Sequence, residues 1–307
     1  MIVAVDLAGE SSGVPSGEWK RDEALSRHTS MRVGGPADLF CEVEAVEALA
    51  GCLRTARAEG LPVFVLGGGT NLVVADRGIR GLTVKLGRSF ATSEWREEGD
   101  QVRIIAGAGG NLKRLVLETI ERGLTGLEFA EGIPGTVGGG LLMNAGAFGG
   151  EISAVVEAIR GVTRDGCAIR MPRDALVFRY RHLDLPTGFV VTGVELRLER
   201  GNPEAIERRA AEAKRKRGRR QPLGLPNAGS IFKNPPGDFA GRLIELAGLK
   251  GERVGGAQIA PQHANFIVNL GGARASDVRD LMGRARDAVW QRRGVWLEPE
   301  VKLVGDW

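Results

Sequence analysis

Three glycine-rich segments constrain the fold of this chain more than any other feature of its sequence. Residues 67–72 follow the apolar run 63–66, residues 107–112 follow the apolar run 102–106, and a third segment covers residues 131–140. Glycine accounts for 46 of the 307 residues, about twice its average usage. A glycine-rich turn after a strand exposes main-chain N–H groups and has no side chain that would keep a phosphate away.

These segments do not match the standard nucleotide-binding motifs. Residues 67–72 are not followed by the Gly-Lys-Ser/Thr of a P-loop. Leu112 stands where a dinucleotide fingerprint has its third glycine. Each segment taken singly is more often just a tight turn. Three of them in one domain favour a nucleotide cofactor that is bound outside a Rossmann fold.

The composition excludes several classes of protein. Hydrophobic residues make up 43% and charged residues 26% of the chain, which is typical of a soluble globular protein. The formal net charge of +4 does not indicate a general polyanion binder. No apolar stretch approaches the roughly 18 residues of a membrane span, and the first residues lack the basic region of a signal peptide. We therefore expect a cytoplasmic protein.

The cysteines and histidines do not indicate a metal site. Cys41, Cys52 and Cys167 are odd in number and have no Cys-x-x-Cys spacing, which favours reduced thiols in a cytoplasmic protein. The three histidines are far apart and lack the spacing of a zinc motif. We expect no bound metal.

Hydrophobic periodicity predicts a mixture of helices and strands in the first two thirds of the chain. Helices are expected over 43–59 and, after the capping residue Asn111, over 112–122. The glycine-rich region 129–151 has little periodicity and is predicted to be a long functional loop. Apolar runs predict strands over residues 62–66, 82–86, 102–106, 152–162 and 189–198.

The pattern changes near residue 200. Asn202 and Pro203 have the residue types of an N-cap and a first helical position, and the helix that they open becomes basic at 214–220. We further expect a helix over 239–247 capped by Asp238. The remaining predicted elements are a last helix from Ser276 to Gly294 and a strand over 295–304.

These elements predict an α+β fold rather than regularly alternating βαβ units. The change of pattern places a domain boundary around residues 200–222. We expect a lead-in over residues 1–25, a first domain over 26–202 and a second domain over 203–307.

Six segments, in matching order over about residues 25–304, resemble those of a known enzyme family. They are residues 28–37, 67–72, 128–139, 143–147, 229–235 and 297–301. In this combination they resemble the UDP-N-acetylenolpyruvoylglucosamine reductase family, flavoenzymes of bacterial peptidoglycan synthesis. The resemblance implies an FAD-binding domain like that of vanillyl-alcohol oxidase (PCMH-type), followed by a smaller α+β substrate-binding domain.

The resemblance also implies a reaction in two halves. NADPH passes a hydride to non-covalently bound FAD, and the reduced flavin gives a hydride to carbon C3 of the enolpyruvyl ether of UDP-N-acetylglucosamine. Negative charge develops at C2 and on the adjacent carboxylate, and a proton must reach C2 to form UDP-N-acetylmuramate. The product serves cell-wall growth, and hence cell shape and division. The implied partners are NADPH and this sugar nucleotide, without nucleic acid or membrane, and the implied state is a monomer or weak oligomer.

Three residues match the catalytic groups of the family. Arg181 matches the arginine that faces the substrate carboxylate, where a guanidinium binds bidentately. Glu300 matches the glutamate that assists the charged intermediate, which it can do as a carboxyl of raised pKa. Ser230 matches the proton donor to C2. The family usually has a serine two residues after the arginine, and this chain has Leu183 there.

The resemblance assigns further residues to cofactor and substrate. Tyr180, Arg220, Asn234 and His263 match positions that contact the sugar nucleotide. Tyr180 is the only tyrosine, so the chain resembles the shorter form of the family, which lacks an inserted loop with a substrate-clamping tyrosine. The matched cofactor positions are Arg32, Gly67, Gly68, Gly69, Thr70, Asn71, Leu72, Ala108, Gly109, Gly132, Ile133, Pro134, Gly135, Thr136, Gly138, Gly139, Asn144, Ala145 and Gly146.

Two other functions stay open. Another FAD oxidoreductase on the same fold could oxidise an alcohol or hydroxy acid, although it need not contain the Ser230 and Glu300 motifs. The basic block 208–220 could bind nucleic acid, but it contains no aromatic side chain for base stacking. Arg220 is assigned to the substrate, whereas the preceding residues 214–219 are typical of a solvated helix face.

Overall fold

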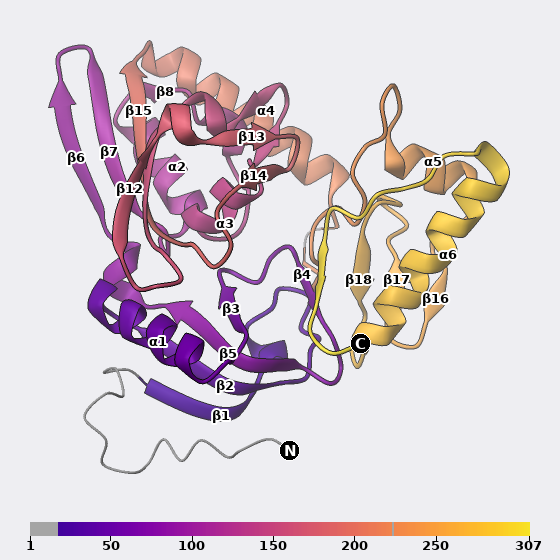
Figure 1. Ribbon diagram of the computed structural model, residues 1–307. Coiled ribbons are helices and arrows are strands. Elements are labelled where there is room, and N and C mark those ends of the chain that lie inside the picture. The colour runs from indigo at the N-terminus through magenta and orange to yellow at the C-terminus, as the bar shows by residue number, and fades with distance from the viewer. Residues whose placement is uncertain (1–17, 223) are drawn as a thin grey trace.

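The computed structural model describes residues 18–222 and 224–307 (Figure 1). Residues 1–17 of the predicted lead-in lie outside the described residues. Its remaining part was wrongly predicted to be irregular, because Glu18–Ala24 forms strand β1. β1 pairs antiparallel with β2 (Pro36–Val43), and Trp19 of β1 packs against the hydrophobic core there. An apolar contact therefore supports a strand whose sequence is mostly polar.

β1 is the edge of a four-stranded sheet with the order β1-β2-β5-β3. β5 (Ile79–Leu86) pairs parallel with both β2 and β3 (Val63–Leu66). Helix α1 (Val46–Ala58) packs on this sheet through the buried side chains of Leu49 and Leu53. The helix starts three residues later than predicted because Val43 ends β2 instead.

A second, antiparallel sheet has the order β12-β11-β15-β7-β6, and β8 adds to β15. Helices α2 (Leu112–Glu121) and α3 (Val137–Leu142) cover its apolar face. Asn111 caps α2 as predicted, since its Oδ1 accepts a hydrogen bond from the Arg114 N–H at 3.0 Å. The strands are β6 (Ser93–Glu98), β7 (Gln101–Gly107), β8 (Leu124–Thr125), β11 (Val156–Val162), β12 (Ala168–Pro172) and β15 (Val190–Arg200).

The region 129–151, predicted as one long loop, contains regular elements. Helix α3 lies within it, and β9 (Gly146–Ala147) and β10 (Gly150–Glu151) form a short hairpin. Thr136 caps α3, because its Oγ1 accepts a hydrogen bond from the Gly139 N–H at 3.2 Å. Three successive glycines in this helix contribute no hydrophobic periodicity, which is why the pattern did not indicate it.

Five short turns of 3-10 helix connect the elements of this part of the chain. One of them takes up residues that were predicted to start the strand 152–162, so β11 begins four residues later than predicted. The turns are η1 (Leu25–Arg27), η2 (Arg88–Ala91), η3 (Glu128–Ala130), η4 (Ile152–Ala154) and η5 (Arg173–Ala175).

Helix α4 (Pro203–Arg220) begins as predicted, with Asn202 Oδ1 accepting a hydrogen bond from the Ala205 N–H at 3.1 Å. The chain then forms a three-stranded sheet of order β16-β17-β18 that packs against a long helix (Figure 1). These later elements are α5 (Ala240–Leu246), β16 (Arg253–Val254), β17 (Ala257–Ile259), β18 (Ile267–Asn269) and α6 (Ala275–Arg293).

The start of α5 differs from the prediction. Asp238 does not cap the helix through a second or third helical N–H but forms an ion pair with Arg242. Instead, Asn234 Oδ1 accepts a hydrogen bond from the Ala240 N–H at 3.1 Å. The helix start is therefore tied to a residue that was predicted to bind substrate.

Long-range contacts also decide the start of α6 and the last strand. α6 starts at Ala275 rather than Ser276, because the distant Asp76 carboxylate accepts hydrogen bonds from both N–H groups, at 2.7 and 3.0 Å. The predicted strand 295–304 is confined to β19 (Lys302–Val304). β19 pairs parallel with β4 (Leu72–Val74), directly after the first glycine segment. This pairing brings the residues near position 300 beside residues 67–72.

The predicted domain limits, 26–202 and 203–307, remain a proposal. Helix α4 belongs to the second range but packs against η3 and α2 of the first. Arg209 of α4 forms an ion pair with Glu128 of η3, with Nη2 and Oε1 2.6 Å apart. The hydrophobic core of the last part also includes Met31 and Val73 from the first part of the chain.

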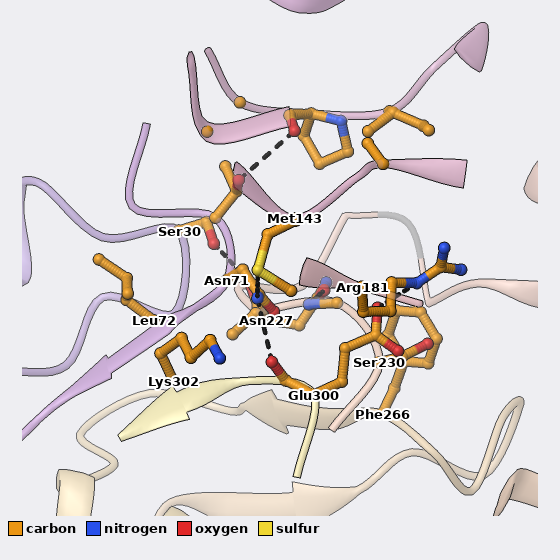
Figure 2. A pocket seen from close by; sticks show the side chains of 18 of the residues that line it. Ser30, Asn71, Leu72, Met143, Arg181, Asn227, Ser230, Phe266, Glu300 and Lys302 are labelled. Carbon is orange, nitrogen blue, oxygen red and sulfur yellow. Dashed lines mark hydrogen bonds and ion pairs between the residues drawn. The ribbon is translucent and has the colours of Figure 1, made fainter. Parts of the chain in front are cut away.

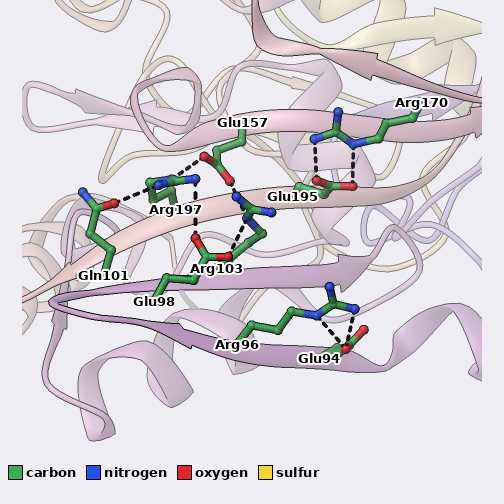
Figure 3. A network of polar contacts seen from close by, with 9 residues as sticks. All are labelled: Glu94, Arg96, Glu98, Gln101, Arg103, Glu157, Arg170, Glu195 and Arg197. Atoms are coloured by element: carbon green, nitrogen blue, oxygen red, sulfur yellow. Dashed lines mark hydrogen bonds and ion pairs between the residues drawn. The ribbon is translucent and has the colours of Figure 1, made fainter.

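The face of the second sheet opposite to α2 and α3 carries a network of ion pairs (Figure 3). Arg160 of β11 and Arg170 of β12 are directly opposite each other in the strand register, an arrangement that repels like charges. The Glu195 carboxylate on β15 accepts hydrogen bonds from both, at 2.8–3.0 Å, and its side chain is only 3% exposed. Bonding to Arg170 and Arg160 lowers the pKa of Glu195 to about 2.

We expect the Glu195→Gln variant to lose roughly 2 kcal/mol of its free energy of unfolding at pH 7, as for a hydrogen bond to a charged group. The folded-state pKa is depressed, so this stabilisation is complete above the ordinary value of 4.5 and is lost as the pH falls towards about 2. The stability difference between wild type and variant should therefore shrink in that window, as measured by urea unfolding. The exposed Glu94, paired with Arg96, provides the control: Glu94→Gln should change stability by about 0.5 kcal/mol or less. Equal effects at pH 7 and pH 3 would contradict the prediction.

Candidate functional site

A cavity of about 1330 Å³ lies between the first and third glycine segments and the last part of the chain. Its wall includes residues 67–72 and 133–136 on one side and Ser230 and Glu300 on the other. Figure 2 shows side chains from distant parts of the sequence pointing towards one another there. The β4–β19 pairing is what joins these walls.

Arg181 is the first of the three predicted catalytic residues in this cavity. It lies in the turn between β13 (Val177–Arg179) and β14 (His182–Asp184), with a φ of 58°. Non-glycine residues rarely adopt this conformation, and surrounding contacts must maintain it. Its Nε donates a hydrogen bond to Glu300 Oε1 at 3.0 Å, and its Nη2 donates one to the Gly146 carbonyl at 2.8 Å.

Glu300 is held by its main chain and is partly buried. Its N–H donates a hydrogen bond to the Ile231 carbonyl at 2.8 Å, and its carbonyl accepts one from Asn71 Nδ2 at 3.1 Å. Burial raises the pKa of Glu300, although the charges of Arg181 and Lys233 act in the opposite direction. The resulting group is a carboxyl that holds its proton to a higher pH than an exposed glutamate does.

Ser230 lies in a turn that is fixed by main-chain contacts on both sides. Asn227 Oδ1 accepts a hydrogen bond from the Gly229 N–H at 3.0 Å, and the Ile231 N–H donates to the Asn265 carbonyl at 2.9 Å. Among the described residues, the Ser230 hydroxyl has no hydrogen-bond partner. The hydroxyl therefore makes no hydrogen bond within its own turn, and it is available to a ligand in the cavity.

The glycine segments form a surface of main chain that side chains would block. A Cβ on Gly68 would lie 2.9 Å from the Gly135 Cα, and one on Gly67 would lie 2.9 Å from Thr136 Oγ1. The first and third segments are thus in direct contact. This is the kind of surface that holds a diphosphate.

Arg217 provides a further observation in favour of a bound anion or polar ring. Its Nε donates a hydrogen bond to the Glu131 carbonyl at 3.1 Å, while its Nη2 is buried without a partner among the described residues. Burial lowers the pKa of Arg217, and the residue lines the cavity. An unpaired guanidinium nitrogen beside the third glycine segment fits a dinucleotide cofactor in this cavity.

The prediction that residues 214–219 form a solvated helix face is therefore wrong at Arg217. Arg209 and Arg217 are eight residues apart and lie on one face of α4, which is turned towards residues 125–131. The spacing of eight residues between these two arginines was a signal in the sequence that could have identified this inward face. Lys216 follows the solvated pattern more closely, since it pairs with Glu212 on the helix surface.

Most of the predicted site residues line the cavity. Besides the catalytic three, they include Asn234 and His263, which were predicted to bind substrate. The side chain of Arg220 lies outside the described residues. The predicted cofactor residues that line the cavity are Gly67, Gly68, Gly69, Thr70, Asn71, Leu72, Ile133, Pro134, Gly135, Thr136, Gly139, Ala145 and Gly146.

Seven predicted residues lie outside the cavity wall. Asn144 is 1% exposed, and its Nδ2 donates a hydrogen bond to the Arg179 carbonyl at 3.2 Å, so it supports the strand before Arg181. The Tyr180 ring is half exposed and packs on the Arg181 guanidinium at 4.9 Å. The other five are Arg32, Ala108, Gly109, Gly132 and Gly138.

Other cavity residues were missed by the sequence reasoning. Ser30 and Met143 lie inside two of the segments that carried the resemblance, but nothing in the pattern marked their side chains as part of a site. Phe148 and Phe239 are exposed by 47% and 67% and line the same cavity. No periodic pattern marks an aromatic side chain in a turn as part of a site.

Of the cysteines and histidines, only His182 and His263 line the cavity that holds Arg181, Ser230 and Glu300. Cys41 and Cys52 are buried with their Sγ atoms 4.0 Å apart, and all three cysteines are free thiols. His28 pairs with Glu23 and stacks on Phe40. Within residues 18–222 and 224–307, no group of His, Cys, Asp and Glu side chains could hold a metal ion.

No helix in the described part of the chain is long and apolar enough to cross a membrane.

Comparisons with known proteins agree with this geometry. A family model described as "FAD binding domain" matches residues 37–171, and one described as "UDP-N-acetylenolpyruvoylglucosamine reductase, C-terminal domain" matches residues 221–304. UDP-N-acetylenolpyruvoylglucosamine reductase 2 of Symbiobacterium thermophilum is 50% identical over 290 residues, which cover 94% of this chain and 93% of that protein. The reductase of Moorella thermoacetica is 45% identical and covers 98% of both chains.

A solved structure supports the same comparison. The crystal structure of UDP-N-acetylenolpyruvylglucosamine reductase from Thermus caldophilus matches with a TM-score of 0.80 and 41% identity, and covers 94% of this chain and 98% of that one. With the matched FAD-binding model, it confirms the expected fold class. The chain is α+β, with an FAD-binding domain in its first part.

Proposed function

The chain belongs to the UDP-N-acetylenolpyruvoylglucosamine reductase family, and from this premise we propose that its cavity positions Arg181, Glu300 and Ser230 around the enolpyruvyl group. The protein is an NADPH-dependent FAD oxidoreductase of peptidoglycan precursor synthesis, which converts UDP-N-acetylglucosamine enolpyruvate to UDP-N-acetylmuramate. The observation that carries the proposal is the meeting of the three side chains in one cavity with the first and third glycine segments.

Arg181 binds the carboxylate of the enolpyruvyl group. Its Nε and Nη2 already bond to Glu300 and to the Gly146 carbonyl, which leaves Nη1 without an acceptor among the described residues. That nitrogen is available to the substrate carboxylate, where negative charge grows during the reaction. A fixed cation at a site of developing charge needs no reorganisation, which is the main source of electrostatic catalysis.

Glu300 and Ser230 complete the site. Burial raises the pKa of Glu300 and so favours the protonated carboxyl, the form that would donate a hydrogen bond to the developing enolate. Ser230 gives its hydroxyl proton to C2, and its position supplies the effect because a serine is a weak acid. The unpartnered hydroxyl and its place in the cavity wall support this role.

The residues that would hold FAD are those of the first and third glycine segments and Arg217. Residues 67–72 would offer main-chain N–H groups to the diphosphate, and residues 133–136 with Arg217 would contact the ring system, since all of them line the cavity. Bound there, FAD would supply the transfer of a hydride from NADPH to C3 of the substrate. The protein's part is to orient the two reactants and to exclude water.

The sugar nucleotide is proposed to contact Asn234 and His263, together with Tyr180 and Arg220. Asn234 Oδ1 is occupied by the Ala240 N–H, so its amide nitrogen is left to donate. His263 Nδ1 accepts a hydrogen bond from the Asn265 N–H at 3.2 Å, so the neutral ring carries its hydrogen on Nε2. We propose that the protein acts in the cytoplasm as a monomer or weak oligomer. We propose no nucleic-acid partner, since α4 turns Arg209 and Arg217 of the basic block inward.

The visible spectrum of the purified protein tests the proposal. We expect the bands of oxidised flavin, which NADPH bleaches and the enolpyruvyl sugar nucleotide restores. The flavin should be released by acid precipitation, as expected for non-covalent FAD. Reduction by an alcohol or hydroxy acid, but not by NADPH, would favour the other flavoenzyme class. A colourless protein that does not take up FAD would overturn the proposal.

A further inference from the structure

Ser30 connects the first glycine segment to the turn that carries Ser230. Its N–H donates a hydrogen bond to the Gly69 carbonyl at 3.0 Å. Its Oγ lies 2.6 Å from the Asn227 carbonyl oxygen and 3.3 Å from that of Gly69. A hydroxyl has a single hydrogen, and the shorter distance assigns it to Asn227. Figure 2 shows Ser30 and Asn227 among the side chains of the cavity.

The contact continues from Asn227 to Ser230 through a tight turn. Asn227 Oδ1 accepts a hydrogen bond from the Gly229 N–H at 3.0 Å, and Asn227 Nδ2 donates one to the Leu225 carbonyl at 2.8 Å. Gly229 has a φ of 76°, a conformation that glycine adopts without strain. Both ends of the Asn227 side chain are thus occupied, and a shift of its main chain must move the turn that ends at Ser230.

A second connection lies next to the first. Asn269 Nδ2 donates a hydrogen bond to the Met31 carbonyl at 3.0 Å, and the Asn269 N–H donates one to the Pro226 carbonyl at 2.9 Å. This contact and the bridge between Asn227 and Val268 also hold the main chain of the segment. The Ser30 hydroxyl differs from the Asn269 contact in that Ser30 lines the cavity and Asn269 does not.

We propose that Ser30 is a positioning residue that holds the Ser230 hydroxyl in register with the cofactor segment 67–72. The inference rests on the proposed role of Ser230 as proton donor. Ser30 does not touch the reacting atoms; it fixes the distance between the surface that would hold FAD and the group that protonates C2. Small displacements matter here, since a misplacement of about 1 Å in an active site can cost on the order of 100-fold in rate.

The test compares Ser30→Ala and Ser30→Thr in the FAD-loaded protein. Ser30→Ala removes the donor to Asn227 and keeps the N–H bond to Gly69, while Ser30→Thr keeps both. Stopped-flow measurement of flavin reoxidation by the sugar nucleotide should show a slowing on the order of 10- to 100-fold for Ser30→Ala and near-normal rates for Ser30→Thr. Reduction by NADPH and the Kd for FAD should change by no more than about twofold for either variant.

A double-mutant cycle separates positioning from general damage. If Ser30 acts through Ser230, Ser30→Ala should slow reoxidation by no more than about twofold in a Ser230→Ala background. Multiplication of the two effects would overturn the proposal. Hydrogen exchange gives a readout besides activity: the Gly229 and Ser230 amides should exchange faster in Ser30→Ala without substrate, and unchanged exchange would contradict the inference.

Two outcomes distinguish the possible failures. A large rise in the Kd for FAD with normal reoxidation would mean that the Ser30 hydroxyl serves the cofactor, and would overturn the positioning role. Normal reoxidation in Ser230→Ala alone would refute the proposed role of Ser230 itself, and the positioning inference would fall with it. A slow Ser230→Ala beside a normal Ser30→Ala would overturn only the inference about Ser30.

Discussion

Ser230→Ala should slow the reoxidation of reduced flavin by the enolpyruvyl sugar nucleotide by about 10²- to 10⁴-fold, the range for loss of a positioned proton donor. Reduction of FAD by NADPH should stay near the wild-type rate, because no proton transfer to C2 occurs in that half of the reaction. The structural reason is that the Ser230 hydroxyl lines the cavity and has no partner among the described residues. The alanine variant keeps the main-chain bonds that hold the turn.

Stopped-flow absorbance measures the two halves separately. The reductive half serves as the internal control, since a folding defect or loss of FAD would slow both halves. Ser276→Ala, at a serine that does not line the cavity, is the matched control and should leave both rates unchanged. Equal slowing of the two halves in Ser230→Ala would remove this serine from the chemistry.

Glu300→Ala should reduce the rate of the same half-reaction by about 10²- to 10³-fold, as expected for loss of one donor to a developing negative charge. Glu300→Gln keeps a neutral donor and should lose less. The alanine variant also leaves Arg181 Nε without its acceptor at 3.0 Å, so the orientation of the guanidinium suffers as well. The loss of the Glu300 carboxyl and the altered orientation of Arg181 both weaken the stabilisation of the negative charge that develops on the enolpyruvyl group.

The pH dependence follows from the raised pKa of Glu300, which burial causes and which Arg181 and Lys233 oppose. The protonated form is the donor, so the oxidative half-reaction should slow as the pH rises through this pKa. Glu300→Gln cannot ionise and should lack that limb of the profile. Glu298→Gln, at a side chain that is 68% exposed and paired with Lys233, is the matched control. A limb that persists in Glu300→Gln would assign the titration to another group.

Much of the local structure could be predicted from the sequence. The starts of α2 and α4 follow from the side chains of Asn111 and Asn202, which cap the helices as expected. Helix capping depends on groups within a few residues of each other, so the sequence contains the whole cause. The start of α6 was mispredicted for the opposite reason, since it depends on the carboxylate of Asp76, 199 residues away from Ala275.

The chemistry of the candidate site was also visible in the sequence, but its connections were not. Asn71 was predicted only to bind cofactor, yet it also donates a hydrogen bond to the carbonyl of Glu300. Arg217 was predicted to lie on a solvated face and instead contacts the Glu131 carbonyl beside the third glycine segment. Both contacts link segments that are far apart along the chain, and local pattern carries no information on them.

The sequence by itself determined which residue types are present for the reaction and where the main chain can approach a phosphate, because both are properties of single residues and short segments. Only the tertiary structure decided that Arg181 and Glu300, 119 residues apart, meet at 3.0 Å. The physical reason is that the parallel pairing of β19 with β4 and the burial of Met31 and Val73 in the last core are non-local. They fix distances across the cavity that no local preference encodes.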